Sequence, residues 1–264
     1  MGVKKGLDIT RESWEVLKQD RELLVFPICS AIAATTIMAT IATAGFLVPE
    51  FGKWMLAMLD EDSSHTFNEH ALGLVCLFVL YFVQWFIVVF FNTALVGCAL
   101  IRFSGGDPTV KDGFRIARQR LPQIVAWALF TSAVGTILSA IEQKLGWLGK
   151  FIIRFIGMAW AVATYFVVPV LAPEGTGPIT AVQRSVTLLK KSWGEGLTGN
   201  IAIHLISGGI SFLLIGLGMT GITVAIYFES MVIAIVTITL LLAVLILVGI
   251  VTSALRQVFL AGLY

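Results

Sequence analysis

The sequence predicts an all-α membrane protein with six transmembrane helices and three short amphipathic interfacial helices on the cytoplasmic side. The first observation is composition: 58% of the 264 residues are hydrophobic, only 13% are charged, and the mean hydropathy is +0.93. A soluble globular domain has about 45–50% apolar and about 25% charged residues. The other two observations are six long apolar stretches and an uneven distribution of basic residues. Together they exclude soluble, disordered and disulfide-scaffold classes.

Each apolar stretch reaches the roughly 20 residues that a helix needs to cross a bilayer. The stretches cover approximately residues 24–48, 71–101, 123–141, 151–172, 199–227 and 230–254. Long continuous apolar runs favour helices over the alternating pattern of a transmembrane β-barrel. We therefore expect one six-span membrane domain that comprises residues 1–264.

The basic residues predict the orientation of these spans. Fourteen of the 18 Lys and Arg residues fall before the first span, after the last span, or in the loops that follow spans two and four. The other four are Lys53, Lys144, Lys150 and Arg154. The positive-inside rule then places both termini in the cytoplasm and the acidic 49–70 loop outside.

Short segments with helical periodicity precede spans one, three and five. Their apolar stripes are Trp14, Leu17 and Leu24; Val110, Phe114, Ala117 and Leu121; and Ile179, Val182, Val186 and Leu189. We expect Asp107 to cap the second of these helices and Pro108 to open it. Such helices lie in the plane of the membrane interface. The unit of one interfacial helix and two spans thus occurs near 1–104, 105–174 and 175–264, by descent from a repeated hairpin or by chance.

Spans in a bilayer associate through close packing of small residues and through hydrogen bonds, because lipid tails are as apolar as leucine. The first span has a row of small residues, Ala31, Thr35, Ala39 and Thr43. We expect this row and the glycine-rich fifth span to be buried in the bundle or against a partner, and the uniformly apolar sixth span to face lipid. Pro169 should kink or end the fourth span, because proline removes a backbone hydrogen bond.

Polar groups at bilayer depth point to function in membrane proteins. The candidates are Gln84 and Asn92 in the second span, and Asn200 and His204 in the fifth. They either form interhelical hydrogen bonds or line a polar permeation path. His204 could ligate a haem only with a second strong ligand, which the sequence does not offer, so a structural role is favoured.

The sequence contains no residue pattern for catalysis, a cofactor or a metal. It has no phosphate-binding loop, no HExxH motif and no GxSxG motif. Cys29, Cys76 and Cys98 are isolated in apolar stretches. His65, His70 and the acidic residues near them match no metal-binding spacing, which favours a solvated acidic loop. We expect a protein that is not an enzyme and has no cofactor, metal or nucleic-acid partner.

Six basic residues form the candidate site for lipid or partner contact: Arg115, Arg118, Arg120, Arg184, Lys190 and Lys191. They come from two loops, and they form one patch if the two interfacial helices lie side by side. Each basic residue near an anionic leaflet contributes about 1 kcal/mol of attraction. The patch would hold anionic lipid or an acidic partner segment. Alternatively, these residues only set the orientation of the protein.

Three blocks of sequence support a family resemblance. They are SWEVLKQDRELLVFP at 13–27, FFNTALVGCAL with GGDPTVKDGF between 90 and 114, and ATYFVVPVLAPEGTGPITAVQRSVTLLKKSWGE at 163–195. Over nearly the whole chain they resemble an uncharacterised prokaryotic family of polytopic membrane proteins, a domain of unknown function. More distantly, the chain is similar to the membrane domain beside some glycerophosphodiester phosphodiesterases, without their catalytic domain. The resemblance implies a prokaryotic inner-membrane location and carries over no site residue.

These observations leave two classes of function open. The first is a non-catalytic inner-membrane protein that binds anionic lipid, or that is a subunit or scaffold of a membrane complex. Its partners would be membrane lipids and other membrane-protein subunits or further copies of itself. The second is a channel or carrier for a small or amphiphilic solute, which the intramembrane polar residues and the possible repeat favour. Retained lipid or a copurifying partner would distinguish the first class, and solute flux the second.

Overall fold

The computed structural model describes residues 2–48 and 67–264. These residues form helices and the turns between them, with no strand in the described ranges. The helices are α1 (Gly2–Gln19), the 3-10 helix η1 (Arg21–Leu24), α2 (Val25–Leu47), α4 (Phe67–Phe103), α5 (Val110–Gln119), α6 (Leu121–Gln143), α7 (Trp147–Ala163), α8 (Val167–Glu174), α9 (Pro178–Tyr227) and α10 (Met231–Leu263). Most of the expected acidic external loop, His65 included, lies outside the described residues.

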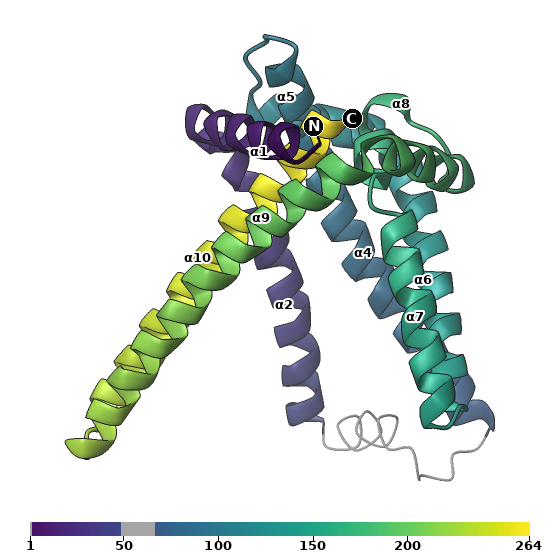
Figure 1. The fold of residues 1–264 in the computed structure, drawn as a ribbon. Coiled ribbons are helices and arrows are strands. Elements are labelled where there is room, and N and C mark those ends of the chain that lie inside the picture. The colour runs from purple at the N-terminus through teal and green to yellow at the C-terminus, as the bar shows by residue number, and fades with distance from the viewer. Residues whose placement is uncertain (1, 49–66) are drawn as a thin grey trace.

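The molecule has a cap at one end, from which long helices diverge (Figure 1). The cap contains α1, α5, α8 and both chain ends. Six segments of the described chain are long and apolar enough to cross a membrane: Arg21–Leu47, Ala71–Phe103, Leu121–Gln143, Trp147–Glu174, Thr198–Tyr227 and Met231–Leu263. The prediction of an all-helical protein with six membrane-spanning segments is confirmed. The chain is a multi-pass helical membrane protein.

The tightly packed core lies in the cap and directly beneath it. Phe26, Phe166 and Phe259 are fully buried, and residues 93–99 of α4 form an unbroken buried run. This end of α4 is the centre of the core, since α4 packs against α2, α5, α6, α8 and α10. Farther from the cap, large apolar side chains such as Phe212 are exposed. Lipid tails surround such side chains in a bilayer, so they need no partner within the protein.

α1 crosses α9 at a close approach that a glycine permits. A Cβ on Gly6 would lie 2.7 Å from the backbone oxygen of Glu195, and Nζ of Lys5 pairs with Oε1 of the same Glu195 at 2.9 Å. Of the expected apolar stripe of this helix, Leu17 is buried in the protein and Trp14 is not. This side chain is 40% exposed, with Nζ of Lys18 5.7 Å from its ring centroid.

The expectation that the small-residue row of the first span is buried in the bundle is wrong, whereas its burial against a partner stays a prediction. Thr35, Ala39 and Thr43 of α2 are exposed, and only the first turn of this helix is buried. α2 packs against α4 at the cap and then separates from it (Figure 1). The hydroxyls of Thr36 and Thr40 donate to backbone carbonyls one turn earlier in α2. These threonines are therefore satisfied within their own helix and need no neighbouring span.

The fourth span is broken where Pro169 predicts. Residues 164–166 form a turn between α7 and α8. Pro169 lacks the N–H that would donate to the carbonyl of Tyr165, so a regular helix cannot continue through this point. The N–H of Phe166 donates to Oγ of Ser185 in α9 at 2.9 Å. The break is thus held in place by the neighbouring helix.

α9 and α10 form an antiparallel hairpin that leads away from the cap (Figure 1). A Cβ on Gly218 would lie 2.5 Å from Cδ2 of Leu241, and a Cβ on Gly221 would lie 2.6 Å from Cγ2 of Thr237. These two glycines of the fifth span are therefore packed as expected, but a Cβ on Gly208, Gly209 or Gly216 would meet nothing within 4 Å, so the expectation is wrong for packing of those three within the bundle. α10 exposes most of its other apolar side chains, as expected for the sixth span. α9 bends at Ser192, whose φ of −111° and ψ of 21° are not helical.

Candidate functional site: the basic surface of α5

The loop before α5 is held in place by ion pairs. Arg102, at the end of α4, pairs with Asp20 and with Asp107 of the loop. Thr109 is the N-cap: its Oγ1 accepts from the N–H of Asp112 (3.3 Å), whose carboxylate accepts from the N–H of Thr109 (3.0 Å). This capping box satisfies two donors that the helix leaves unpaired. The expectation that Asp107 caps the helix and Pro108 opens it is wrong, because Thr109 is the N-cap, α5 begins at Val110, and Arg102 pairs with the carboxylate of Asp107.

Gly113 seats α5 on α4 and α2. It is buried, as is Ala117 one turn later. A Cβ on Gly113 would lie 2.8 Å from Sγ of Cys98 and 3.0 Å from the backbone oxygen of Ala94, and it would overlap the ring of Phe26. The backbone of α5 therefore lies directly on its neighbours, and the opposite face of the helix points outward.

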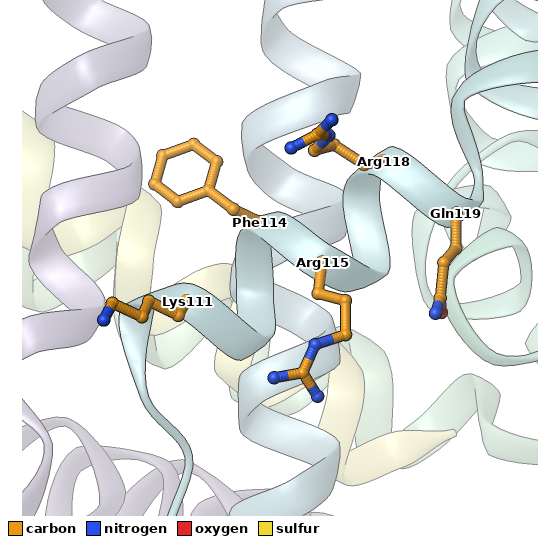
Figure 2. A pocket seen from close by; sticks show the side chains of 5 residues that line it. All are labelled: Lys111, Phe114, Arg115, Arg118 and Gln119. Carbon is orange, nitrogen blue, oxygen red and sulfur yellow. The ribbon is translucent and has the colours of Figure 1, made fainter.

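The outward face of α5 borders an open groove of about 640 Å³, called the α5 groove here. Five side chains line it: Lys111, Phe114, Arg115, Arg118 and Gln119 (Figure 2). Figure 2 shows the three cationic side chains extending in different directions around the ring of Phe114. That ring packs against Phe26 and Phe91, with centroid distances of 5.5 and 6.2 Å. The α5 groove thus has an aromatic wall and a cationic rim.

The rim of the α5 groove is positively charged overall. Nη2 of Arg115 pairs with Oδ1 of Asp112 at 2.9 Å. Hydrogen bonds from Thr109, together with the charge of Arg115, lower the pKa of Asp112, so this carboxylate is ionised at neutral pH. Lys111 and Arg118 have no acidic partner in the described part of the chain. Two of the three cations are therefore uncompensated.

Arg120, at the end of α5, has a structural role. Its Nε donates to the backbone oxygen of Ala172 (3.0 Å) and its Nη2 to that of Pro173 (2.6 Å). These are among the last carbonyls of α8, which have no partner inside the helix. Gly175 follows with φ +62°, and a Cβ there would overlap the Arg120 guanidinium. Arg120 thus ties the end of α5 to the end of α8.

The remaining predicted contact residues, Arg184, Lys190 and Lys191, lie on the first segment of α9. Nε of Arg184 donates to Oε1 of Glu174 (3.1 Å), which also accepts from the hydroxyl of Tyr264 (2.7 Å). Burial and the contact with Glu174 raise the pKa of Tyr264 to about 12. Lys190 and Lys191 are exposed, with no acidic partner among the described residues. Of the six predicted cations, Arg115, Arg120 and Arg184 are therefore engaged within the protein.

The four intramembrane polar residues lie on two helices. Gln84 and Asn92 are half-buried on α4, and His204 is exposed on α9. The side-chain oxygen of Asn200 is buried without a hydrogen-bond partner. No hydrogen bond joins the α4 pair to the α9 pair in the described ranges. Within the same ranges, no group of three His, Cys, Asp or Glu side chains is placed to hold a metal ion.

Comparison with known proteins shows the family of the chain. Residues 71–264 match a family of unknown function, DUF6159. The chain belongs to this family. The match includes the α5 groove and the α9–α10 hairpin, and it begins after α1 and α2. No curated protein matches the chain.

Three residues of the groove in this DUF6159 member, Lys111, Phe114 and Gln119, are not among the contact residues predicted from the sequence. The spacing of the cations in the sequence is the signal that could have identified Lys111. Lys111, Arg115 and Arg118 recur at i, i+4 and i+7, which places them on one helix face. The relation of this family to phosphodiesterase membrane domains stays a prediction.

Proposed function

We propose that the chain is a non-catalytic protein of the prokaryotic inner membrane that binds anionic phospholipid in the α5 groove. The observation that supports this most directly is the pair of uncompensated cations, Lys111 and Arg118, beside the ring of Phe114. A phospholipid has matching parts, a phosphate for the cations and an acyl chain for an aromatic wall. The same surface can serve a lone protein or a subunit of a membrane complex.

The positive-inside rule supports a cytoplasmic cap with both termini on that side. α1, α5 and the first segment of α9 would then lie at the level of the lipid head groups, where anionic lipids attract basic side chains. In this arrangement α5 presents its cations to the head groups while Gly113 and Ala117 keep it seated on the core.

Titration of phosphatidylglycerol into the detergent-solubilised full chain, followed by native mass spectrometry, tests the proposal. Neutralising Lys111 and Arg118 to Gln should weaken binding about 30-fold, since each charge contributes about 1 kcal/mol. The control variant carries Lys144→Gln and Arg154→Gln, which remove the same charge near the start of α7, and it should bind as the wild type does. Equal affinity of both double variants for phosphatidylglycerol would refute the proposal.

A carrier for a small or amphiphilic solute is the second candidate. The observation in its favour is the side-chain oxygen of Asn200, which is buried in the α9 span without a hydrogen-bond partner. Flux measured in proteoliposomes distinguishes the two functions. A carrier should transport solute, with a rate that falls in Gln84→Leu and Asn92→Leu. A lipid-binding protein should show no flux above that of empty vesicles.

A further inference from the structure

A second groove lies between α5 and the ends of α4 and α8, and it is called the α8 groove here. Its volume is about 440 Å³, which falls within the range of about 300–1,000 Å³ that is typical of ligand pockets. Its polar side chains are those of Ser104, Gln119 and Arg120. The other side chains that line it are apolar: Leu100, Ile101, Ile116, Ala172 and Pro173.

The α8 groove lies at the cap end of two membrane-spanning segments. Its residues on α4 run from Gly97 to Ser104, at the end of the Ala71–Phe103 segment, and its residues on α8 are at the end of the Trp147–Glu174 segment. Seven residues of helix span about 10 Å. The groove therefore follows α4 for about 10 Å into the span. A Cβ on Gly97 would lie 2.8 Å from Cδ1 of Ile116, so α5 lies directly on α4 at the deeper end.

Gln119 connects the two grooves, because it lines both of them. A helix turns by about 100° per residue, so Gln119 lies about 80° around α5 from Lys111, and Ile116 lies about 60° farther in the same direction. Phe114 lies about 60° from Lys111 in the opposite direction. The cationic rim therefore has the ring of Phe114 on one flank and the α8 groove on the other.

We propose that the phospholipid of the α5 groove places one acyl chain in the α8 groove and the other against Phe114, so that the site selects a lipid with two chains. This inference rests on the proposed function. The phosphate would contact the cationic rim of α5 rather than Arg120, whose Nε and Nη2 already donate to the backbone oxygens of Ala172 and Pro173. An acyl chain suits an apolar groove at the end of two spans, whereas an extended peptide would leave backbone groups unpaired there.

Native mass spectrometry of the full chain in a neutral detergent compares dioleoyl phosphatidylglycerol with its one-chain form, oleoyl lysophosphatidylglycerol. The two probes have the same head group, so they differ in what they can place on the flanks of α5. Van der Waals contacts along the α8 groove should make the two-chain lipid bind about tenfold more tightly. Equal affinity for the two probes would refute the selection of a two-chain lipid.

Ser104→Trp should fill the α8 groove from its rim. Ser104 is exposed, and its hydroxyl donates to the backbone oxygen of Leu100 one turn earlier (2.8 Å). This variant should bind the two-chain lipid about tenfold more weakly and the one-chain lipid as the wild type does. The matched control is Thr187→Trp, at an exposed position of α9 whose hydroxyl also donates one turn back, to the oxygen of Gln183 (2.9 Å). The control should bind both probes as the wild type does.

A phosphatidylglycerol that carries a diazirine in both acyl chains locates the chains without any substitution. After irradiation of the wild type, the label should be enriched in the peptides that contain residues 97–104 and 116–120. A label spread evenly over the spans would mean that only bulk lipid contacts the groove, and it would overturn the proposal. This measurement decides the question if Ser104→Trp lowers the melting temperature relative to Thr187→Trp.

The head group is tested separately from the chains. Lys111→Gln combined with Arg118→Gln should weaken both probes by the same factor, because it removes charge from the rim alone. If this double variant weakens both probes while a stable Ser104→Trp changes neither, the head group binds as proposed and no chain enters the α8 groove. If the double variant binds both probes as the wild type does, the proposed function is refuted and this inference with it.

Discussion

Gly113→Ala tests whether α5 is seated on the core as described. The added Cβ would lie 2.8 Å from Sγ of Cys98 and 3.0 Å from the backbone oxygen of Ala94, and it would overlap Cζ of Phe26. The oxygen of Ala94 belongs to the buried backbone of α4, so it cannot move aside as the end of a flexible side chain can. Overpacking of a core costs about 1–3 kcal/mol. Alanine is more favourable than glycine within a helix by about 0.5–1 kcal/mol, which offsets only part of this cost, so the net change should destabilise the protein.

The measurement is thermal unfolding of the full chain in a mild detergent, followed by circular dichroism. A net loss of about 1–2 kcal/mol lowers the melting temperature by about 2–8 °C in a chain of this size. Gly208→Ala is the control, because a Cβ at Gly208 meets nothing within 4 Å. That variant should be as stable as the wild type or slightly more stable. Both substitutions add the same methyl group to a helix, so the difference between them reports the contact alone.

The partner side chain provides a second check. In the double variant Gly113→Ala, Phe26→Leu, the smaller side chain removes the overlap, so the two effects should sum to less than their separate costs. Additive costs would show that Gly113 and Phe26 do not touch. A melting temperature of Gly113→Ala equal to that of the Gly208→Ala control would mean that α5 is not packed on α2 and α4.

Three further outcomes are expected. The pKa of Asp112 is lowered in the folded protein, so the contribution of this carboxylate to stability is present above its unfolded pKa and is lost as the pH falls through its folded pKa. Asp112→Asn should therefore lower the melting temperature at neutral pH and make it depend less on pH in the acid range. Gly175→Ala should lower the melting temperature, because φ is +62° and the Cβ would overlap Arg120; normal stability would contradict that contact. A cysteine at Gly146 should react with an impermeant thiol reagent outside the cell and one at Gly106 should not, and the reverse result would invert the topology.

The number and positions of the spans could be predicted because a bilayer leaves the backbone few choices. Within the hydrocarbon layer each backbone group must be satisfied by its own helix, so length and apolarity identify a span without knowledge of its neighbours. The break at 164–166 could be predicted from the sequence for the same local reason, because Pro169 removes one defined backbone hydrogen bond. The ion pair between Asp20 and Arg102 could not be predicted from the sequence, because it joins residues 82 positions apart in the chain.

The error on α2 has a physical cause. A row of threonine and alanine permits close packing of a second helix but does not require one. Thr36 and Thr40, which lie beside this row, bond to their own backbone and therefore need no partner helix when they face lipid. The α5 groove was missed in part for a related reason. Counting basic residues by loop gives their side of the membrane, but only the seating of Gly113 determines which helix face points outward.

The polar contacts that join distant elements are concentrated at the cap, and this distribution bears on how a bound lipid could act. Lys5 pairs with Glu195, Arg102 with Asp20, and Tyr264 with Glu174. The spans beyond the cap diverge (Figure 1), so their directions are determined largely at the cap. The proposed lipid site lies on α5, in the cap, so a lipid bound there would contact the end of the molecule at which these directions are determined.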